Sequence, residues 1–248
     1  MTFALTIFGT FLTRSGVIAS VHAFALSSVG PLLLAFLGVI LIGSFALFAM
    51  RSEMVASAPR LDSLVSREGF ILVNSLLMTL FGFTVFFGTM YPLLVEAFTG
   101  REVAVGRPFF DRVAVPIAFL VLLAIGTGAT APWRVASGKV LWQRTRVGLN
   151  VGLACAALTV LVGVSSLGVV AVVGLAGFVI GNILAFYFHQ AGRAHRGGKP
   201  WPSALWSTVR NERGFWGGQV AHIGVALSVV AIATTSVLAT RTEVPLAR

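Results

Sequence analysis

The fold is decided by one stretch near the end of the chain, Gly214-Phe-Trp-Gly-Gly-Gln-Val-Ala-His-Ile-Gly-Val-Ala-Leu-Ser-Val-Val-Ala-Ile232. It belongs to a run from Gly214 to Ala239 that contains no charged residue. At ~1.5 Å per helical residue, such a run is long enough to cross the ~30 Å hydrocarbon core of a membrane. The stretch therefore predicts a membrane-spanning helix.

His222 is the polar group that this helix would carry into the lipid. It lies about two helical turns beyond the charged flank of residues 210–213, and therefore well below the headgroups. A polar group without a partner in hydrocarbon costs several kcal/mol, so an ionisable residue at this depth is a functional candidate. The alternative is a structural histidine that is hydrogen-bonded to a neighbouring helix.

Composition places the whole chain in the membrane class. Of its 248 residues, 57% are hydrophobic and only 10% are charged, whereas soluble domains are about 25% charged. The mean hydropathy of +0.94 agrees with this comparison. A soluble globular domain is excluded, and a polytopic membrane protein is expected.

Charge and cysteine content exclude several functions. The net charge is +10, but the basic residues occur in short loops, which is typical of membrane topology signals and not of nucleic-acid binding. The single cysteine, Cys155, lies in an apolar segment, so the sequence offers no disulfide, no CxxC pair and no zinc cluster. Any thiol chemistry must therefore come from a partner.

Apolar segments organise the chain, at residues 2–13, 30–50, 70–95, 113–131, 147–165, 169–189 and 215–239. They predict an all-α, polytopic membrane helix bundle of about six to seven transmembrane helices, formed by residues 1–248 as a single transmembrane domain. The first segment corresponds to only ~18 Å of helix, which is too short to cross. We expect either that Met1 is not the natural start or that another chain completes this helix.

Basic residues assign the two sides of the membrane. Twelve of the eighteen lie in three alternate loops, and the other six lie in the loops between them and at the C-terminus. By the positive-inside rule, the side with twelve is cytoplasmic. We therefore expect the loops at 14–29 and 96–112, together with the C-terminus, on the outer side.

The outer segment at residues 15–28 is too short to span and too apolar for an ordinary loop. Val17, Val21 and Phe24 recur at helical spacing, which predicts an interfacial helix lying on the membrane surface. Such a helix presents His22 near the outer interface. His22 is either a ligand or a surface histidine with one backbone hydrogen bond, and the sequence leaves both open.

Aromatic and proline residues give further structural predictions. The third span is expected to end at Tyr91-Pro92, and residues 105–111 are expected to form a fixed outer turn whose paired phenylalanines anchor in lipid or rest on a flat ligand. The tryptophans that flank the inner side are expected to be interface anchors: Trp201, Trp206 and Trp216. Two histidines among arginines are expected to be solvated, without a function: His189 and His195.

The chemistry that remains centres on histidine. No span carries paired carboxylates, and no Ser-His-Asp spacing, P-loop or GxGxxG context occurs, so a hydrolase or a nucleotide-driven pump is unsupported. Neutral imidazole is a common metal ligand and can be an axial ligand of haem iron, which makes His22 and His222 candidates. Arg14, near the outer face, matches a haem propionate because its fork of donors fits a carboxylate.

Four ordered stretches carry a resemblance to a known family. They are Thr10-Phe-Leu-Thr-Arg-Ser-Gly-Val-Ile-Ala-Ser-Val-His-Ala-Phe-Ala25, then Ser66-Arg-Glu-Gly-Phe-Ile-Leu-Val-Asn74 with Thr84-Val-Phe-Phe-Gly-Thr-Met-Tyr-Pro-Leu93, then Val105-Gly-Arg-Pro-Phe-Phe-Asp111, and Gly217-Gly-Gln-Val-Ala-His-Ile-Gly224. They resemble the CcmF family of cytochrome c maturation proteins, the membrane haem lyases. Residues 133–213 match only in hydropathy and topology.

The resemblance implies a function. The family attaches haem to the CxxCH thiols of apocytochrome c on the outer face of the bacterial inner membrane, and takes that haem from a chaperone of the CcmE type. It implies that His22 is a ligand for the incoming haem iron, and that His222 is one of two histidines that ligate a resident b-type haem. Thiol-handling maturation subunits and membrane lipid are the other expected partners, and nucleic acid is not one.

The sequence also departs from the family. The tryptophan-rich haem-handling segment, the second outer histidine and the second membrane histidine are absent, and in full-length members they precede the position of Met1. We therefore expect an internal portion of a haem lyase that needs an N-terminal haem-lyase part and is not active alone. The alternatives are a multi-span transporter or permease subunit, and an assembly subunit that only scaffolds its partners.

Overall fold

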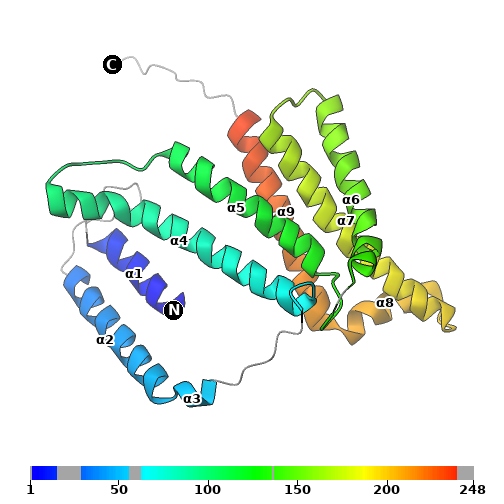
Figure 1. Ribbon diagram of the computed structural model, residues 1–248, viewed down its shortest axis with the longest axis horizontal. Helices are drawn as coiled ribbons and strands as arrows, with labels where there is room; N and C mark the ends of the chain where they lie inside the picture. Colours follow the sequence, from blue (N-terminus) through cyan, green and yellow to red (C-terminus); the bar gives the residue numbers. More distant parts are fainter. Residues whose placement is uncertain (1, 16–28, 56–62, 136, 239–248) are drawn as a thin grey trace. The chain divides into compact units, whose positions relative to one another are not determined.

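The computed structural model describes residues 2–15, 29–55, 63–135 and 137–238, and the regular elements in these ranges are all α-helices. The helices are α1 (Thr2–Arg14), α2 (Val29–Met50), α3 (Ser52–Val55), α4 (Arg67–Thr99), α5 (Arg107–Gly128), α6 (Gly138–Leu161), α7 (Leu167–Arg196), α8 (Trp201–Asn211) and α9 (Arg213–Leu238) (Figure 1). The all-α prediction is confirmed. The expected interfacial helix at 15–28 falls almost entirely outside the described residues.

Five of the described helices are long and apolar enough to cross a membrane: Val29–Met50, Arg67–Thr99, Arg107–Gly128, Leu167–Arg196 and Arg213–Val237. Large apolar side chains such as Leu32, Ile42 and Leu76 are exposed on them, which suits a lipid environment. The prediction of a multi-pass membrane helix bundle is confirmed. The span expected at 147–165 has no counterpart among these five, because α6 carries Lys139, Arg144 and Arg146 in its first half.

The described chain divides into two compact units, one from residues 1–60 and 87–105 and the other from residues 61–86 and 106–248. In the first unit, α1 packs against α2, and the rings of Phe3 and Phe36 meet edge to face at 6.5 Å. α1 has 13 residues and is as short as the sequence predicted. The prediction of a single transmembrane domain stays a prediction.

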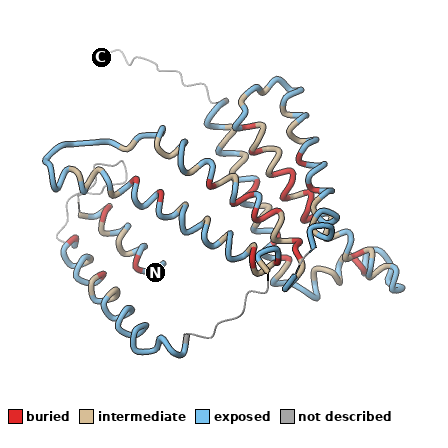
Figure 2. Tube along the Cα trace, in the orientation of Figure 1, coloured by how far each residue is buried: buried red, intermediate tan, exposed pale blue. Residues whose placement is uncertain are grey.

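The second unit is built around α7. This helix packs against α5, α6, α8 and α9, and Figure 2 shows its buried residues along much of its length. Apolar side chains from α5, α7 and α9, including Leu122, Val179 and Ala226, form the hydrophobic core. The core therefore lies on the α7 side of α5 and α9.

Glycines bring α6 and α7 into close contact. A Cβ added at Gly148 would stand 2.6 Å from the carbonyl oxygen of Phe178, and one at Gly152 would stand 2.5 Å from that of Gly174. Small residues let helix backbones approach in this way inside membranes. The side chain of Asn182, 0% exposed, joins three helices: its Oδ1 accepts from Gly148 N at 3.1 Å, and its Nδ2 donates to the carbonyl oxygen of Gly126 at 3.1 Å.

The connection between α4 and α5 is shorter than the sequence indicated. α4 continues through Pro92 to Thr99, and α5 begins at Arg107, so the expected outer loop at 96–112 shrinks to residues 100–106. The predicted fixed turn at 105–111 is wrong, because Pro108 occupies the first turn of α5. A proline is tolerated there since the first helical N–H groups have no intrahelical acceptor.

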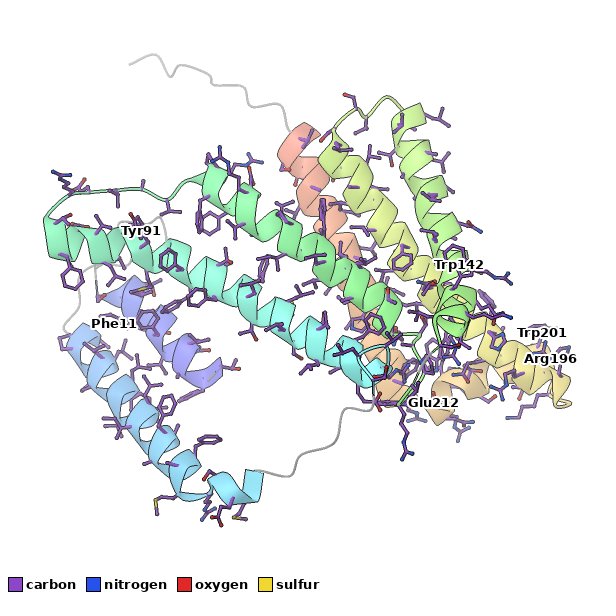
Figure 3. All side chains as sticks on the ribbon, viewed as in Figure 1. Phe11, Tyr91, Trp142, Arg196, Trp201 and Glu212 are labelled. Atoms are coloured by element: carbon purple, nitrogen blue, oxygen red, sulfur yellow. The ribbon has the colours of Figure 1, made fainter. Side chains whose placement is uncertain are left out.

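Several helices begin or end at one end of the second unit. Figure 1 shows there the starts of α4, α6 and α9 beside the end of α5, while α7 runs on past them and α8 turns back toward α9. Figure 3 shows Arg196 and Trp201 at the tip where α7 passes into α8, and Glu212 near the start of α9. The basic stretches at 134–146 and 193–213, which lie partly in α6, α7 and α8, therefore share one end of the bundle, as the topology predicts, while its assignment to the cytoplasm stays a prediction.

Candidate functional site

A row of small residues on α9 leads to His222. Gly214, Gly218 and His222 are spaced by four residues and therefore lie on one face of the helix. All three line a cavity of about 330 Å³ that α4 and α5 also bound. A Cβ added at Gly214 or Gly218 would meet nothing within 4 Å, so these glycines face open space.

The opposite walls of this cavity come from α4 and α5. The α4 side contributes Phe70, Ile71 and Asn74, and the α5 side contributes small and apolar residues that include Ala124 and Gly128. α4 and α5 touch here, since a Cβ added at Gly128 would stand 2.7 Å from the Cβ of Phe70. The cavity is mostly apolar, and Gly214 and Gly218 leave its α9 side open.

Three polar atoms interrupt this apolar lining. The Nδ1 of His222, the Oδ1 of Asn74 and the Oε1 of Gln219 are each buried and have no hydrogen-bond partner among the described residues. Gln219 as a whole is only 5% exposed. Nearly all buried polar groups in native proteins are paired, so three orphans around one cavity indicate a ligand position.

Arg67 lines the cavity and connects the helices around it. Its guanidinium donates to the carbonyl oxygen of Ala129 at 2.6 Å and lies 5.0 Å from the ring centroids of both Trp133 and Phe215. The last carbonyl groups of a helix have no intrahelical donor, so Arg67 satisfies one at the end of α5 while its charge rests on aromatic faces. It thereby ties the start of α4 to α5 and to α9.

Two further contacts fix the same corner. The guanidinium of Arg144 donates to the carbonyl oxygen of Thr130 at 2.8 Å, and the backbone N–H of Arg134 donates to the carboxylate of Glu68 at 2.9 Å. Sequence reasoning missed Arg67 and Arg144 as parts of the site. In the sequence these arginines have the pattern of membrane topology signals. No local sequence pattern indicates which carbonyl oxygens accept their hydrogen bonds.

The sequence-predicted site residues lie in different parts of the molecule. His222 is half-buried in the cavity. Arg14 ends α1 in the first unit, and His22 lies outside the described residues. Of the predicted site residues that the structure describes, His222 lines the cavity and Arg14 does not, and the ligand roles of His222, Arg14 and His22 stay predictions.

The other histidines and tryptophans divide into surface and core. His189 is exposed, whereas the Nδ1 of His195 lies 2.8 Å from the carbonyl oxygen of Lys199 and its ring stacks on Trp201 at 4.5 Å, which fixes the turn between α7 and α8. Trp216 was expected at the membrane interface, and this is wrong. It is 6% exposed, because its ring packs against Phe186 and Tyr187 of α7.

No cluster of protein ligands accompanies His222. Among the residues that the structure describes, no three His, Cys, Asp or Glu side chains converge on a point where a metal ion could bind.

Comparison with known proteins finds relatives that match almost the whole chain. The chain is 34% identical over 98% of its length to the cytochrome c-type biogenesis protein CycK of Rhizobium meliloti, of which it covers 36%. It is 33% identical over 94% of its length to CcmF of Pseudomonas aeruginosa and 31% identical over 93% to CcmF of Escherichia coli K12, and it covers 35% and 34% of these relatives. The chain is homologous to the CcmF/CycK cytochrome c-type biogenesis proteins.

This homology confirms the resemblance and sets its extent. The chain spans about a third of the length of the CcmF/CycK relatives that it matches. No family model and no solved structure matches the chain. Since the matches to CcmF/CycK cover almost the whole chain, residues 214–222 of α9 and the cavity beneath them fall within a CcmF/CycK-like sequence.

Proposed function

We propose that this chain works in cytochrome c maturation as part of a membrane haem lyase, and that His222 ligates a resident b-type haem. The observation that carries the proposal is the imidazole of His222, whose Nδ1 is buried without a partner in a cavity of a CcmF/CycK-like chain. An ionisable side chain kept at that depth without a structural bond indicates a functional role.

The residues around the cavity fit a haem. Its glycine side on α9, at Gly214 and Gly218, leaves room for the flat face of a porphyrin close to the helix backbone. Phe70 and Phe215 supply aromatic surface against its edges, and the orphaned amide oxygens belong to side chains that can turn toward a ligated imidazole. A neutral imidazole is a common axial ligand of haem iron.

Each residue has a defined part in holding such a group. His222 would supply a nitrogen ligand, and the apolar wall from Ala124 to Gly128 would lower the local dielectric around it. Arg67 keeps the start of α4 close to α5 and α9 beside the cavity. A haem held by these residues would supply a one-electron redox centre to the proposed lyase.

The substrates and partners follow the same proposal. The lyase attaches haem to the CxxCH thiols of apocytochrome c on the outer face of the inner membrane, with the thiols as nucleophiles and the chain supplying position and iron ligation. His22 receives the incoming haem from a chaperone of the CcmE type, and Arg14 pairs with a propionate. Thiol-handling maturation subunits and an N-terminal haem-lyase part complete the assembly.

Haem titration of the purified chain tests the ligand assignment. We expect haemin, added to the full chain in detergent and then reduced with dithionite, to give the absorption bands of a histidine-ligated haem. His222→Ala should lose these bands. His189→Ala, which removes an exposed histidine from α7, is the matched control and should keep them. Equal spectra from the wild-type chain and His222→Ala would contradict the assignment.

A second experiment tests the outer histidine separately. The complete assembly, with its N-terminal part, should lose covalent cytochrome c formation on His22→Ala while it retains the b-type absorption. Unchanged formation of cytochrome c would remove His22 from the proposal and leave His222 in place.

A further inference from the structure

Gln219 is a buried polar side chain of the second unit without a partner for its oxygen. It is 5% exposed, and its Oε1 accepts no hydrogen bond from any described residue. A buried amide oxygen without a donor destabilises a folded protein, and does so more strongly in the hydrocarbon layer. An apolar side chain would fill this place without that cost, so the carboxamide calls for a reason.

An unpaired nitrogen that can donate, the Nδ1 of His222, lies about one turn further along the same helix, while the Nε1 of Trp216 lies about one turn before Gln219 and lines a different cavity. Gln219 and His222 are three residues apart on α9, which places their side chains beside each other. Side chains of a helix lean toward its N-terminus, so the ring of His222 lies over the turn that contains Gly218 and Gln219. The bare Gly218 leaves space for the ring and for a carboxamide that turns toward it.

The two orphaned atoms are chemically complementary. A neutral imidazole carries a proton on one nitrogen and an acceptor lone pair on the other. If the proton is on the buried Nδ1 of His222, that nitrogen needs an acceptor, and the Oε1 of Gln219 is an acceptor without a donor. Histidines that ligate metals almost always donate their second N–H to an oxygen atom.

We propose that Gln219 is the positioning residue of His222. Its Oε1 accepts the hydrogen bond from the Nδ1–H of His222, which fixes the ring orientation and leaves Nε2 to ligate the haem iron. This inference rests on the proposed function of His222. It makes the carboxamide a control on the basicity of the axial ligand, because an acceptor at Nδ1–H pushes electron density onto the ring.

Asn74 offers the competing assignment. Its Oδ1 is a second orphaned acceptor on the wall of the same cavity, contributed by α4. We assign the bond to Gln219, because it shares a helix with His222 and is the more deeply buried of the two. The partnership within one helix survives movements of α4, whereas a bond from Asn74 would not.

The experiment measures the iron–histidine bond itself. The full chain is loaded with haem, reduced, and examined by resonance Raman spectroscopy, in which the Fe(II)–His stretching band rises with the strength of the hydrogen bond at Nδ1–H. Gln219→Met keeps the length of the side chain and removes the acceptor, so we expect a lower band and about 10- to 100-fold weaker haem binding. Gln219→Glu keeps an acceptor and should restore the band to at least its wild-type position.

Controls separate positioning from folding and from the parent proposal. Gln143→Met makes the same substitution at an exposed site on α6 and should change nothing. A band that stays in place in Gln219→Met, or that moves in Asn74→Leu instead, overturns the inference while His222 remains the ligand. If Gln219→Met loses its helical circular dichroism, Gln219→Glu decides the test instead. Its Fe(II)–His stretching band must then not lie below that of the wild-type chain. Absence of any band that depends on His222 refutes the proposed function itself.

Discussion

Glycines and carboxamide side chains occur both at the α6–α7 contact and at the α9 cavity, but with different structural roles. At α6–α7, Gly148 and Gly152 pack directly against the backbone of α7. The carboxamide of Asn182 makes hydrogen bonds through both its oxygen and its nitrogen. At α9, Gly214 and Gly218 face open space, and the oxygen of Gln219 has no donor among the described residues. Small and amide residues thus mark packing where they are satisfied and a ligand position where they are not.

The largest expected effect breaks the packed side. Gly148→Leu places a side chain where even a Cβ would stand 2.6 Å from the carbonyl oxygen of Phe178, so α6 and α7 must separate. Overpacking of this kind costs about 1–3 kcal/mol of unfolding free energy. Denaturant unfolding of the chain in detergent measures it. The control is Gly192→Leu on α7, where a Cβ meets nothing within 4 Å, and its free energy of unfolding should remain near the wild-type value. An equally large loss of stability in Gly192→Leu would contradict the prediction.

The corresponding change on the open side should spare stability and remove binding. Gly218→Leu projects into the cavity beside His222, and we expect haem affinity to fall at least tenfold, about 1.4 kcal/mol, with the unfolding midpoint unchanged. Haemin titration followed at the absorption bands measures this. Gly217→Leu is the control, since Gly217 lines a different cavity. If Gly218→Leu binds haem as the wild-type chain does, the glycine face is not a ligand surface.

The next smaller effect is expected on stability when the carboxamide of Asn182 is removed. Asn182→Leu keeps the branched shape of the side chain but removes its bonds to the backbone of Gly148 and Gly126. Hydrogen bonds between membrane helices average about 0.6 kcal/mol, so we expect a loss of roughly 1 kcal/mol of unfolding free energy. Thermal unfolding followed by circular dichroism detects it. An unaltered transition would show that the glycine contact alone holds α5, α6 and α7.

The smallest effect, and the one with the opposite sign, belongs to Gln219. In the haem-free chain, Gln219→Leu removes an oxygen that lacks a donor, so stability should stay within about 0.5 kcal/mol of the wild-type chain or rise. The same unfolding assay compares it directly with Asn182→Leu. A loss equal to that of Asn182→Leu would mean that Gln219 is structural without its ligand.

The helical segments and the candidate histidine could be predicted from the sequence, because both depend on local properties. A run without charges specifies a span, and the place of His222 within it specifies its depth. The walls of the cavity could not be predicted in this way. Arg67 bonds to a carbonyl oxygen 62 residues further along the chain, and that pairing exists only once α4, α5 and α9 have packed.

Boundaries and aromatic positions failed for related reasons. Pro92 and Pro108 suggested breaks, yet one lies inside α4 and the other in the first turn of α5, where the lost N–H has little cost. Trp216 has the flank position of an interface anchor, but tertiary contacts with α7 place it in the core. Hydropathy does not predict whether a helix continues through a proline. It also does not predict whether a tryptophan side chain packs in the protein core or lies at the membrane interface.

The buried ring of Trp216 also gives the molecule an intrinsic optical reporter. The other four tryptophans are 47% to 67% exposed, whereas Trp216 is 6% exposed within a group of aromatic side chains. Its fluorescence should therefore emit at shorter wavelength than theirs, and it adjoins Phe215 on the cavity wall. Since a porphyrin is an efficient acceptor of excitation energy from indole, occupancy beside His222 can be followed as quenching of the tryptophan fluorescence, in which this blue-shifted component is resolved from the others.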